Sequence, residues 1–115
     1  MNYIMHEMKL DPLPFKMIGN GEKTVGMRLF DERRRKIKVG DMIRFENRES
    51  GEELLVRVTS CDVFPSFVEL YRAYSKESIG YRSDEVASPA DMEKYYSPED
   101  IEKYGAFAIG IELIK

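Results

Sequence analysis

The strict alternation over residues 106–114 constrains the fold of this chain more than any other feature. Large apolar side chains stand at every second position, and the positions between them are mostly small: the first set is Phe107, Ile109, Ile111 and Leu113, the second Ala108, Gly110 and Glu112. A period of two places one set on each face of a β-strand. The pattern predicts a strand from Ala106 to Ile114, and its small residues indicate that another part of the chain packs closely on the second face.

Four other segments have strand patterns, and short helices are expected between them. The predicted strands cover residues 6–10, 24–29, 42–47 and 54–64. Helix starts are indicated by the prolines at 12 and 14 and by the serines at 66, 88 and 97, which are typical capping residues. Most helices fall between the fourth and fifth strands, without regular strand-helix alternation. The sequence therefore predicts an α+β fold, with an antiparallel sheet curled into a small barrel and accompanied by short helices.

The single cysteine and single histidine exclude many kinds of site. With only Cys61, the chain cannot form an internal disulfide or a cysteine-based zinc site, and with only His6 it cannot form a histidine-pair metal site. We expect neither a metal nor a cofactor. No apolar run approaches the roughly 20 residues of a membrane helix, and no secretory signal is evident. We expect a cytoplasmic protein of one domain, residues 1–115.

Charge is distributed unevenly along the chain. The net charge is −3, from 18 basic and 21 acidic residues, which does not fit a high-affinity, nonspecific nucleic-acid binder. A basic run nevertheless occupies residues 28–38 and includes Arg28, Arg33, Arg34, Arg35 and Lys36, whereas residues 84–102 are mostly acidic. Either run can simply be a solvated face.

A glycine-rich turn over residues 19–24 leads into the second predicted strand. It lacks the Walker spacing for a phosphate loop. It does deliver Lys23 and Thr24 to the strand, on which Arg28 shares a face with Thr24. A lysine, a hydroxyl and a guanidinium that converge can recognise an anion or a base. The alternative is an exposed strand edge whose lysine deters pairing.

The second half of the chain is rich in tyrosine. Aromatic faces beside cations hold the bases of single-stranded RNA, although tyrosines at helix ends are also common packing residues. For catalysis, the available side chains are Lys23, Thr24, Glu69 and Glu77. A desolvated lysine can activate water while a carboxylate relays protons.

Three longer stretches resemble one known family. The stretch MKLDPLPFKMIGNGEKTVGMRLFDERRRKIKVGDMIRFEN is similar to the opening of the ASCH domain, with its G-x-K-T-V-E-x-R-L motif followed by G-D-x-I-x-F. The later stretches ELYRAYSKESIGYRS and DMEKYYSPEDIEKYGAFAIGIELI resemble the second half of small bacterial members. The resemblance implies a PUA-like fold, a β-barrel with short helices, and an RNA-binding cleft beside the barrel.

The resemblance also suggests site residues. It places Lys23, Thr24 and Arg28 at the cleft, with Gly40-Asp41 as a structural turn. If the chain binds RNA, we expect the basic run to neutralise phosphates through Arg33, Arg34, Arg35 and Lys36. This chain departs from the motif at Gly26, where the family commonly has glutamate.

Three functions remain open at this point. The first is the binding of RNA or a modified nucleoside. The second is hydrolysis, either of RNA or of an acetylated cytidine as in the related amidohydrolases, with Lys23, Thr24 and Glu77 as the implied catalytic residues. The third is a protein-interaction module with no ligand in the cleft.

Overall fold

The alternating segments form one five-stranded sheet. In the computed structural model, which describes residues 3–114, the strands are β1 (Met5–Leu10), β2 (Val25–Leu29), β3 (Met42–Asn47), β4 (Glu53–Phe64) and β5 (Ala106–Leu113). Their order across the sheet is β1-β3-β4-β5-β2. The predicted strands and the α+β class are confirmed. The sheet is antiparallel except between β1 and β3, which pair in parallel because a long connection containing a helix and β2 separates them.

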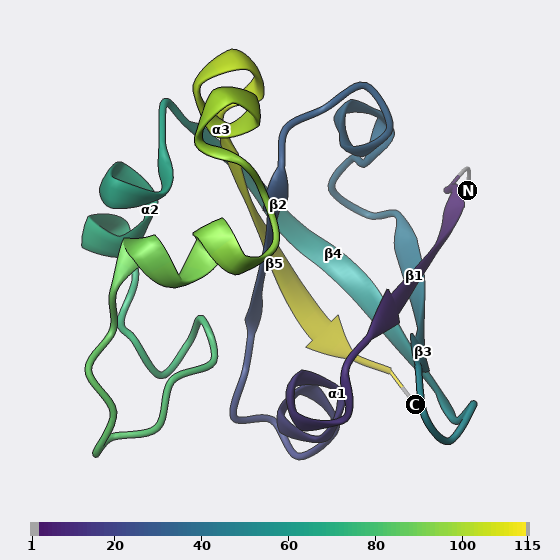
Figure 1. The fold of residues 1–115 in the computed structure, drawn as a ribbon. Coiled ribbons are helices and arrows are strands. Elements are labelled where there is room, and N and C mark those ends of the chain that lie inside the picture. Colours follow the sequence, from purple (N-terminus) through teal and green to yellow (C-terminus); the bar gives the residue numbers. More distant parts are fainter. Residues whose placement is uncertain (1–2, 115) are drawn as a thin grey trace.

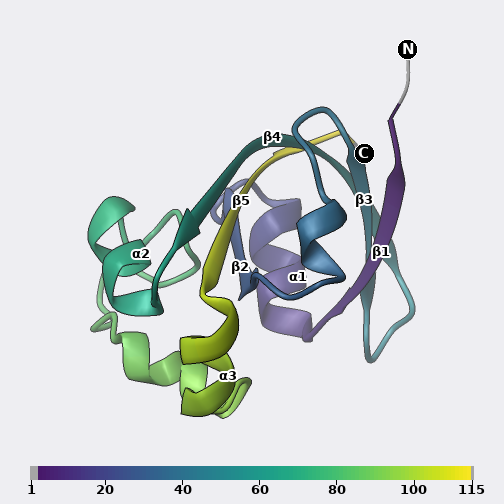
Figure 2. The ribbon, with the colours of Figure 1, turned by 90° about the horizontal axis from the view of Figure 1, so that it is seen from above.

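The sheet curls into a half-barrel whose two edge strands are β1 and β2 (Figures 1 and 2). Helix α1 (Pro12–Gly19) lies at one end of the curled sheet, and the short 3₁₀ helix η1 (Arg34–Lys36) lies near the other (Figure 1). Because no further strand joins β1 to β2, the half-barrel has an open seam between these edges.

The inside of the half-barrel holds one hydrophobic core. Its members come from four of the strands, from α1 and from the loop after η1: Leu10, Phe15, Ile18, Ile37, Ile43, Phe45, Val56, Val58, Phe107, Ile109 and Ile111. The large residues of the β5 alternation all point inward, apart from exposed Leu113. The period-two pattern of β5 therefore determines which of its side chains face the inner core.

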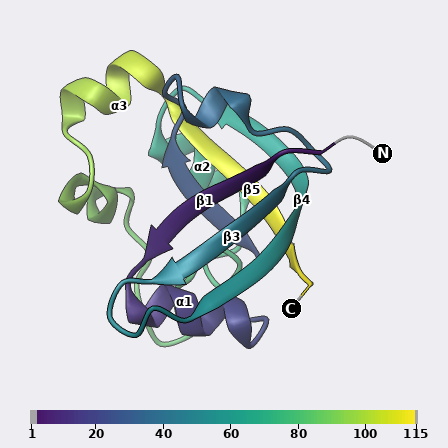
Figure 3. The ribbon, with the colours of Figure 1, turned by 90° about the vertical axis from the view of Figure 1, so that its right-hand side faces the viewer.

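A second core covers the outer face of β2 and β5. It packs Val25, Met27 and Leu29 of β2 against α2 (Phe67–Ala73), against the 3₁₀ helix η2 (Pro89–Lys94) and near α3 (Pro98–Tyr104) (Figure 3). Ala106 and Ala108 are completely buried here. A side chain at Gly110 would overlap Ser60. The expected close packing against the small residues of β5 is confirmed.

Serine caps begin two of the three helices for which a serine cap is predicted. The Ser66 hydroxyl accepts from the amide of Val68 at 3.2 Å, and that of Ser97 accepts from the amide of Asp100 at 3.1 Å. The prediction of a cap at Ser88 is wrong. The Ser88 side chain makes no capping bond, because η2 is a tighter 3₁₀ turn in which the Ser88 carbonyl accepts from the amide of Asp91.

Asp41 ties β1 to the turn before β3. Its buried carboxylate is 2.8 Å from His6 Nε2 and accepts from the amides of Lys38 and Ile4 at 3.0 and 3.2 Å. Burial alone would raise the pKa of Asp41, but the bonds from His6 and the two amides hold this pKa below its usual value. The predicted Gly40-Asp41 turn is confirmed.

The variant Asp41→Asn is expected to lower the free energy of unfolding at pH 7 by about 1 to 3 kcal/mol, because the amide cannot satisfy all three donors. A carboxyl group whose pKa is depressed by folding stabilises the protein above its unfolded pKa. That stabilisation disappears as the pH falls through the folded pKa. The gap between wild type and variant in urea unfolding should therefore shrink below about pH 4. The exposed Asp84→Asn variant is the control, and an equal gap at pH 7 and pH 3 would contradict this account.

Candidate functional site

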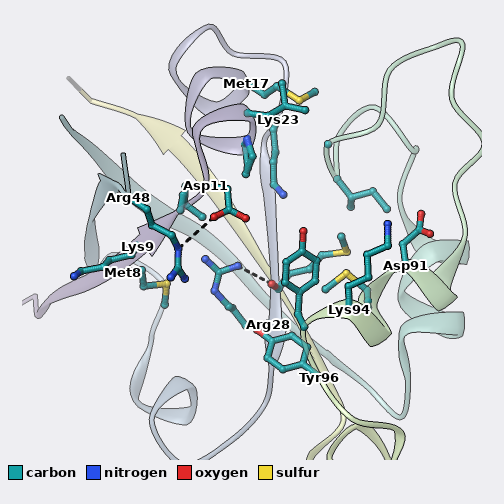
Figure 4. Close-up of a pocket in the computed structure, with 18 of the residues that line it drawn as sticks. Met8, Lys9, Asp11, Met17, Lys23, Arg28, Arg48, Asp91, Lys94 and Tyr96 are labelled. Carbon is teal, nitrogen blue, oxygen red and sulfur yellow. Dashed lines mark hydrogen bonds and ion pairs between the residues drawn. The ribbon is translucent and has the colours of Figure 1, made fainter. Parts of the chain in front are cut away.

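A cleft of about 860 Å³ occupies the open seam of the half-barrel. Residues 7–10 of β1 and Met27 and Arg28 of β2 form its two sides, and residues 79–81, 91–92 and 94–96 close it from the direction of η2 (Figure 4). The seam is present because β1 and β2 do not pair, so the cleft is a direct consequence of the strand order.

The walls of the cleft are more basic than the protein as a whole. Eight of the lining residues are basic (Lys9, Lys23, Arg28, Arg33, Arg34, Arg44, Arg48 and Lys94) and six are acidic (Glu7, Asp11, Glu46, Glu53, Glu85 and Asp91). The cleft thus has an excess of positive charge in a chain whose net charge is −3. A concave surface concentrates such a charge and attracts anions.

Arg28 projects from the inner face of β2 into this seam. The Ile111 amide donates to the Thr24 carbonyl across the β2–β5 pair, so the alternation of the ladder places the Met27 carbonyl on the free edge of β2. The Arg28 guanidinium donates to that carbonyl at 2.8 Å and has no carboxylate within 4.0 Å among the described residues. Burial lowers the pKa of Arg28, and the neighbouring cations Arg34 and Arg48 lower it further. This guanidinium therefore keeps donors available for a ligand.

Lys23 enters the cleft just before β2 begins. The main chain around it is held by the Ser78 carbonyl, which accepts from the amides of Thr24 and Val25 at 3.0 Å. The Lys23 ammonium lies against Gly80 and points toward the same space as Arg28 (Figure 4). Burial, with a smaller effect of Arg28, lowers the pKa of Lys23 to about 8. Lys23 has no ion-pair partner in residues 3–114.

Three other arginines of the cleft have carboxylate partners, namely Arg34, Arg44 and Arg48, whereas Arg33 donates to the Glu7 carbonyl. Arg48 Nε is 3.5 Å from Asp11, and Arg34 Nη1 is 2.7 Å from Asp31. These carboxylates neutralise part of the positive charge that lines the cleft. Lys23 and Arg28 are the partly buried cations of the cleft that lack a carboxylate within 4.0 Å in residues 3–114. A bound anion would therefore stabilise these two charges most.

The tyrosines of the second half are mainly structural. The hydroxyl groups of Tyr71 and Tyr81 are 2.8 Å apart, and the Tyr81 hydroxyl donates to Asp91 at 2.7 Å. Burial and these bonds raise the pKa of Tyr81. Tyr96 stacks on Phe67 with ring centres 6.2 Å apart. All four of these tyrosines line the cleft, but Tyr95 differs in being 64% exposed, which leaves an aromatic face for a ligand.

The structure brings some of the predicted site residues together and separates others. Lys23, Arg28, Arg33 and Arg34 line the cleft. The other four lie outside its lining: Thr24, Arg35, Lys36 and Glu77, all of them exposed. Thr24 precedes β2, and Glu77 lies in the loop between α2 and η2. Arg35 instead covers the Phe30 ring at 4.9 Å. Glu69 bonds with Ser66 at the start of α2, also outside the cleft.

Sequence reasoning missed other residues of the cleft wall, notably Arg48 and Asp91. Each lies far along the chain from Lys23 and Arg28 and carries no motif. Only the folding of β3 and η2 around the seam places them there, so periodicity offered no signal for them.

Within residues 3–114 we find no cluster of three or more histidine, cysteine or acidic side chains suited to a metal ion. The same residues include no helix with the length and hydrophobicity needed to cross a membrane.

Comparison with known families and structures gives a consistent result. The family model described as "ASCH domain" matches residues 8–115. No curated protein matches the chain. Among solved structures, the hypothetical protein PH0355 is 35% identical with a TM-score of 0.82, and the match covers 96% of this chain and 100% of that one.

Two further structures are similar. Protein PF0455 from Pyrococcus furiosus is 34% identical with a TM-score of 0.74, over 97% of this chain and 99% of that one. The S128A mutant of ZmASCH from Zymomonas mobilis is 16% identical with a TM-score of 0.69, over 94% of this chain and 67% of that one. At this identity the last similarity concerns the fold alone.

Proposed function

This chain belongs to the ASCH domain family, and from that membership we propose that its cleft binds RNA or a nucleoside. One observation carries the proposal: Lys23 and Arg28 face the cleft without carboxylate partners among the described residues. Cations without a carboxylate partner can bind a phosphate, to which the planar arginine guanidinium can donate two hydrogen bonds.

The exposed aromatic side chain that lines the cleft, Tyr95, supports the same ligand. Tyr95 is exposed while Tyr71, Tyr81 and Tyr96 are engaged with their neighbours. Proteins that bind single-stranded nucleic acid combine a cationic groove with an aromatic face on which a base stacks. We assign the phosphate to Lys23 and Arg28 and the stacked base to Tyr95.

The arginines near the β1 side extend the cationic surface. Arg33 and Arg34 lie beside the cleft centre, so we propose them as contacts for a neighbouring phosphate. The negative net charge of the chain predicts modest, salt-sensitive affinity.

Arg28→Ala is expected to weaken the binding of a short single-stranded RNA about tenfold or more, as measured by fluorescence anisotropy at low salt. It should also reduce the log-log salt slope by about 0.7, because one phosphate contact on a single strand is lost. Arg57→Ala is the matched control, since Arg57 is exposed on β4 outside the cleft. Equal affinity and slope in wild type and Arg28→Ala, with both variants folded, would remove Arg28 from the site.

Hydrolysis is the second candidate function, and the lowered pKa of Lys23 favours it. With a pKa of about 8, a substantial fraction of Lys23 is neutral in mildly alkaline solution and can accept a proton from water. That water would attack the acetyl carbonyl of an acetylated cytidine and release acetate and cytidine. Glu77 lies outside the cleft lining, so the structure offers no support for it as the partner.

If this activity exists, chromatography should detect cytidine released from N-acetylcytidine at a rate that rises through about pH 8 as Lys23 loses its proton. Lys23→Ala should abolish the release, and Lys36→Ala should leave it unchanged because Lys36 is exposed outside the cleft. Release by Lys23→Ala at the wild-type rate would eliminate Lys23 as the base.

A further inference from the structure

Gly26 occupies the middle of β2 without a steric reason for being glycine. Its φ lies outside the left-handed region, so the backbone there accepts any residue. A Cβ at this position would meet only the Ile109 carbonyl oxygen, at an ordinary distance of 3.9 Å. Because glycine weakens a strand interior and often marks a place where a ligand approaches the backbone, the space beside Gly26 is notable.

That space is a small recess behind the main cleft. It has a volume of about 10 Å³ and is lined by Lys23, Gly26 and Arg28 together with apolar side chains of the inner core. Lys23 and Arg28 also line the main cleft, so the two spaces adjoin. Its lining includes Ile43 and Ile109, which are 0% and 2% exposed. The recess has room for about one atom the size of a water oxygen.

The charges at this recess are unbalanced. Neither Lys23 nor Arg28 has a carboxylate within 4.0 Å among residues 3–114, whereas Arg34 and Arg48 do. Within the described part of the chain, Arg28 makes a single side-chain hydrogen bond, to the Met27 carbonyl. Holding two cations close together in a partly buried place is unfavourable unless an anion joins them.

We propose that Lys23 and Arg28 bind a terminal phosphate monoester and that one of its oxygens enters the recess beside Gly26. The proposal rests on the proposed function and specifies which end of the ligand enters the cleft. A phosphodiester carries a single negative charge and leaves one of the two cations unmatched. A phosphate monoester is nearly dianionic at neutral pH, so its charge matches both cations.

The source of the phosphate can be a free 5′-nucleotide or the 5′-phosphorylated end of an RNA. Both present the same monoester, and both leave a base outside the recess, in the part of the cleft that Tyr95 borders. The experiment therefore compares ligands that differ only in this group.

The test is calorimetric titration with the four 5′-nucleoside monophosphates, the four nucleosides and ribose 5-phosphate. We expect at least one monophosphate to bind about tenfold or more tightly than its nucleoside. Gly26→Glu should eliminate this preference, because its carboxylate would lie beside Lys23 and Arg28 and neutralise the two cations. Gly26→Ala adds an uncharged methyl group, which would meet only the Ile109 carbonyl oxygen at 3.9 Å, so it should reduce the preference less than Gly26→Glu does. A hexanucleotide with a 5′-phosphate, compared with its 5′-hydroxyl form, then distinguishes an RNA end from a free nucleotide.

The outcomes separate this inference from the proposed function. If nucleosides or RNA bind but phosphate adds nothing, or if Gly26→Glu keeps the preference while folded, the recess is not a phosphate site and the proposed function stands. If only ribose 5-phosphate binds, and Gly26→Glu abolishes that binding, the phosphate site stands and nucleoside recognition fails. If none of the monophosphates and ribose 5-phosphate binds, the inference is overturned.

Discussion

Gly105→Ala is expected to lower the free energy of unfolding by about 3 kcal/mol or more, the largest loss from any methyl-sized substitution considered for this chain. Gly105 ends α3 with φ 82° and ψ 178°, a region that essentially only glycine adopts. A Cβ there would lie 2.8 Å from the Phe64 carbonyl oxygen. That oxygen belongs to the main chain where β4 pairs with β5, so it cannot rotate away as a side chain would.

The matched control is Gly51→Ala. Gly51 has φ 77°, but a Cβ there would have nothing within 4 Å. The free energy of unfolding of Gly51→Ala should fall by only about 1 kcal/mol, the cost of a positive φ for alanine. Urea unfolding of both variants measures what the Phe64 contact and the unusual Gly105 backbone cost together beyond an ordinary positive-φ site, and similar losses in the two would show that both are relieved at little cost.

Much of the fold was predictable because local patterns match burial. The alternation in β2 and β5 describes real faces, with Met27 packed against the outer helices and Ile109 in the inner core. The parallel pairing of β1 with β3 was not predictable in this way. It depends on which strand meets which across long connections, and the composition of a strand such as 42–47 does not encode its partner.

The site was predictable only where a motif was continuous in sequence. Lys23 and Arg28 belong to one turn and strand, and the structure places both in the cleft. Alternation alone suggested that Thr24 would accompany Arg28, yet Thr24 precedes β2 and lies outside the lining. Tyr95 is there because η2 packs beside the seam, an arrangement that no spacing in the sequence reveals.

Lys23→Met is expected to stabilise the protein by about 1 to 3 kcal/mol at pH 7 and to abolish RNA binding. Methionine retains the flexible apolar stem but removes the ammonium group, whose burial disfavours the folded state. The substitution raises stability but removes binding, because the buried Lys23 charge destabilises the fold and is needed only for the ligand. A residue that serves only the fold would not behave in this way.

The dependence of stability on pH tests whether the buried Lys23 ammonium group is what destabilises the fold. The pKa of Lys23 is lowered from 10.5 to about 8, so the unfolded chain binds more protons than the folded one between these values. Wild-type stability should therefore rise as the pH increases from about 8 to 10.5, and the advantage of Lys23→Met should shrink over the same interval. The exposed Lys36→Met control should change neither stability nor its pH dependence. If Lys23→Met instead lost stability at pH 7, the ammonium group would be satisfied within the fold, and its assignment to a ligand would lose its physical basis.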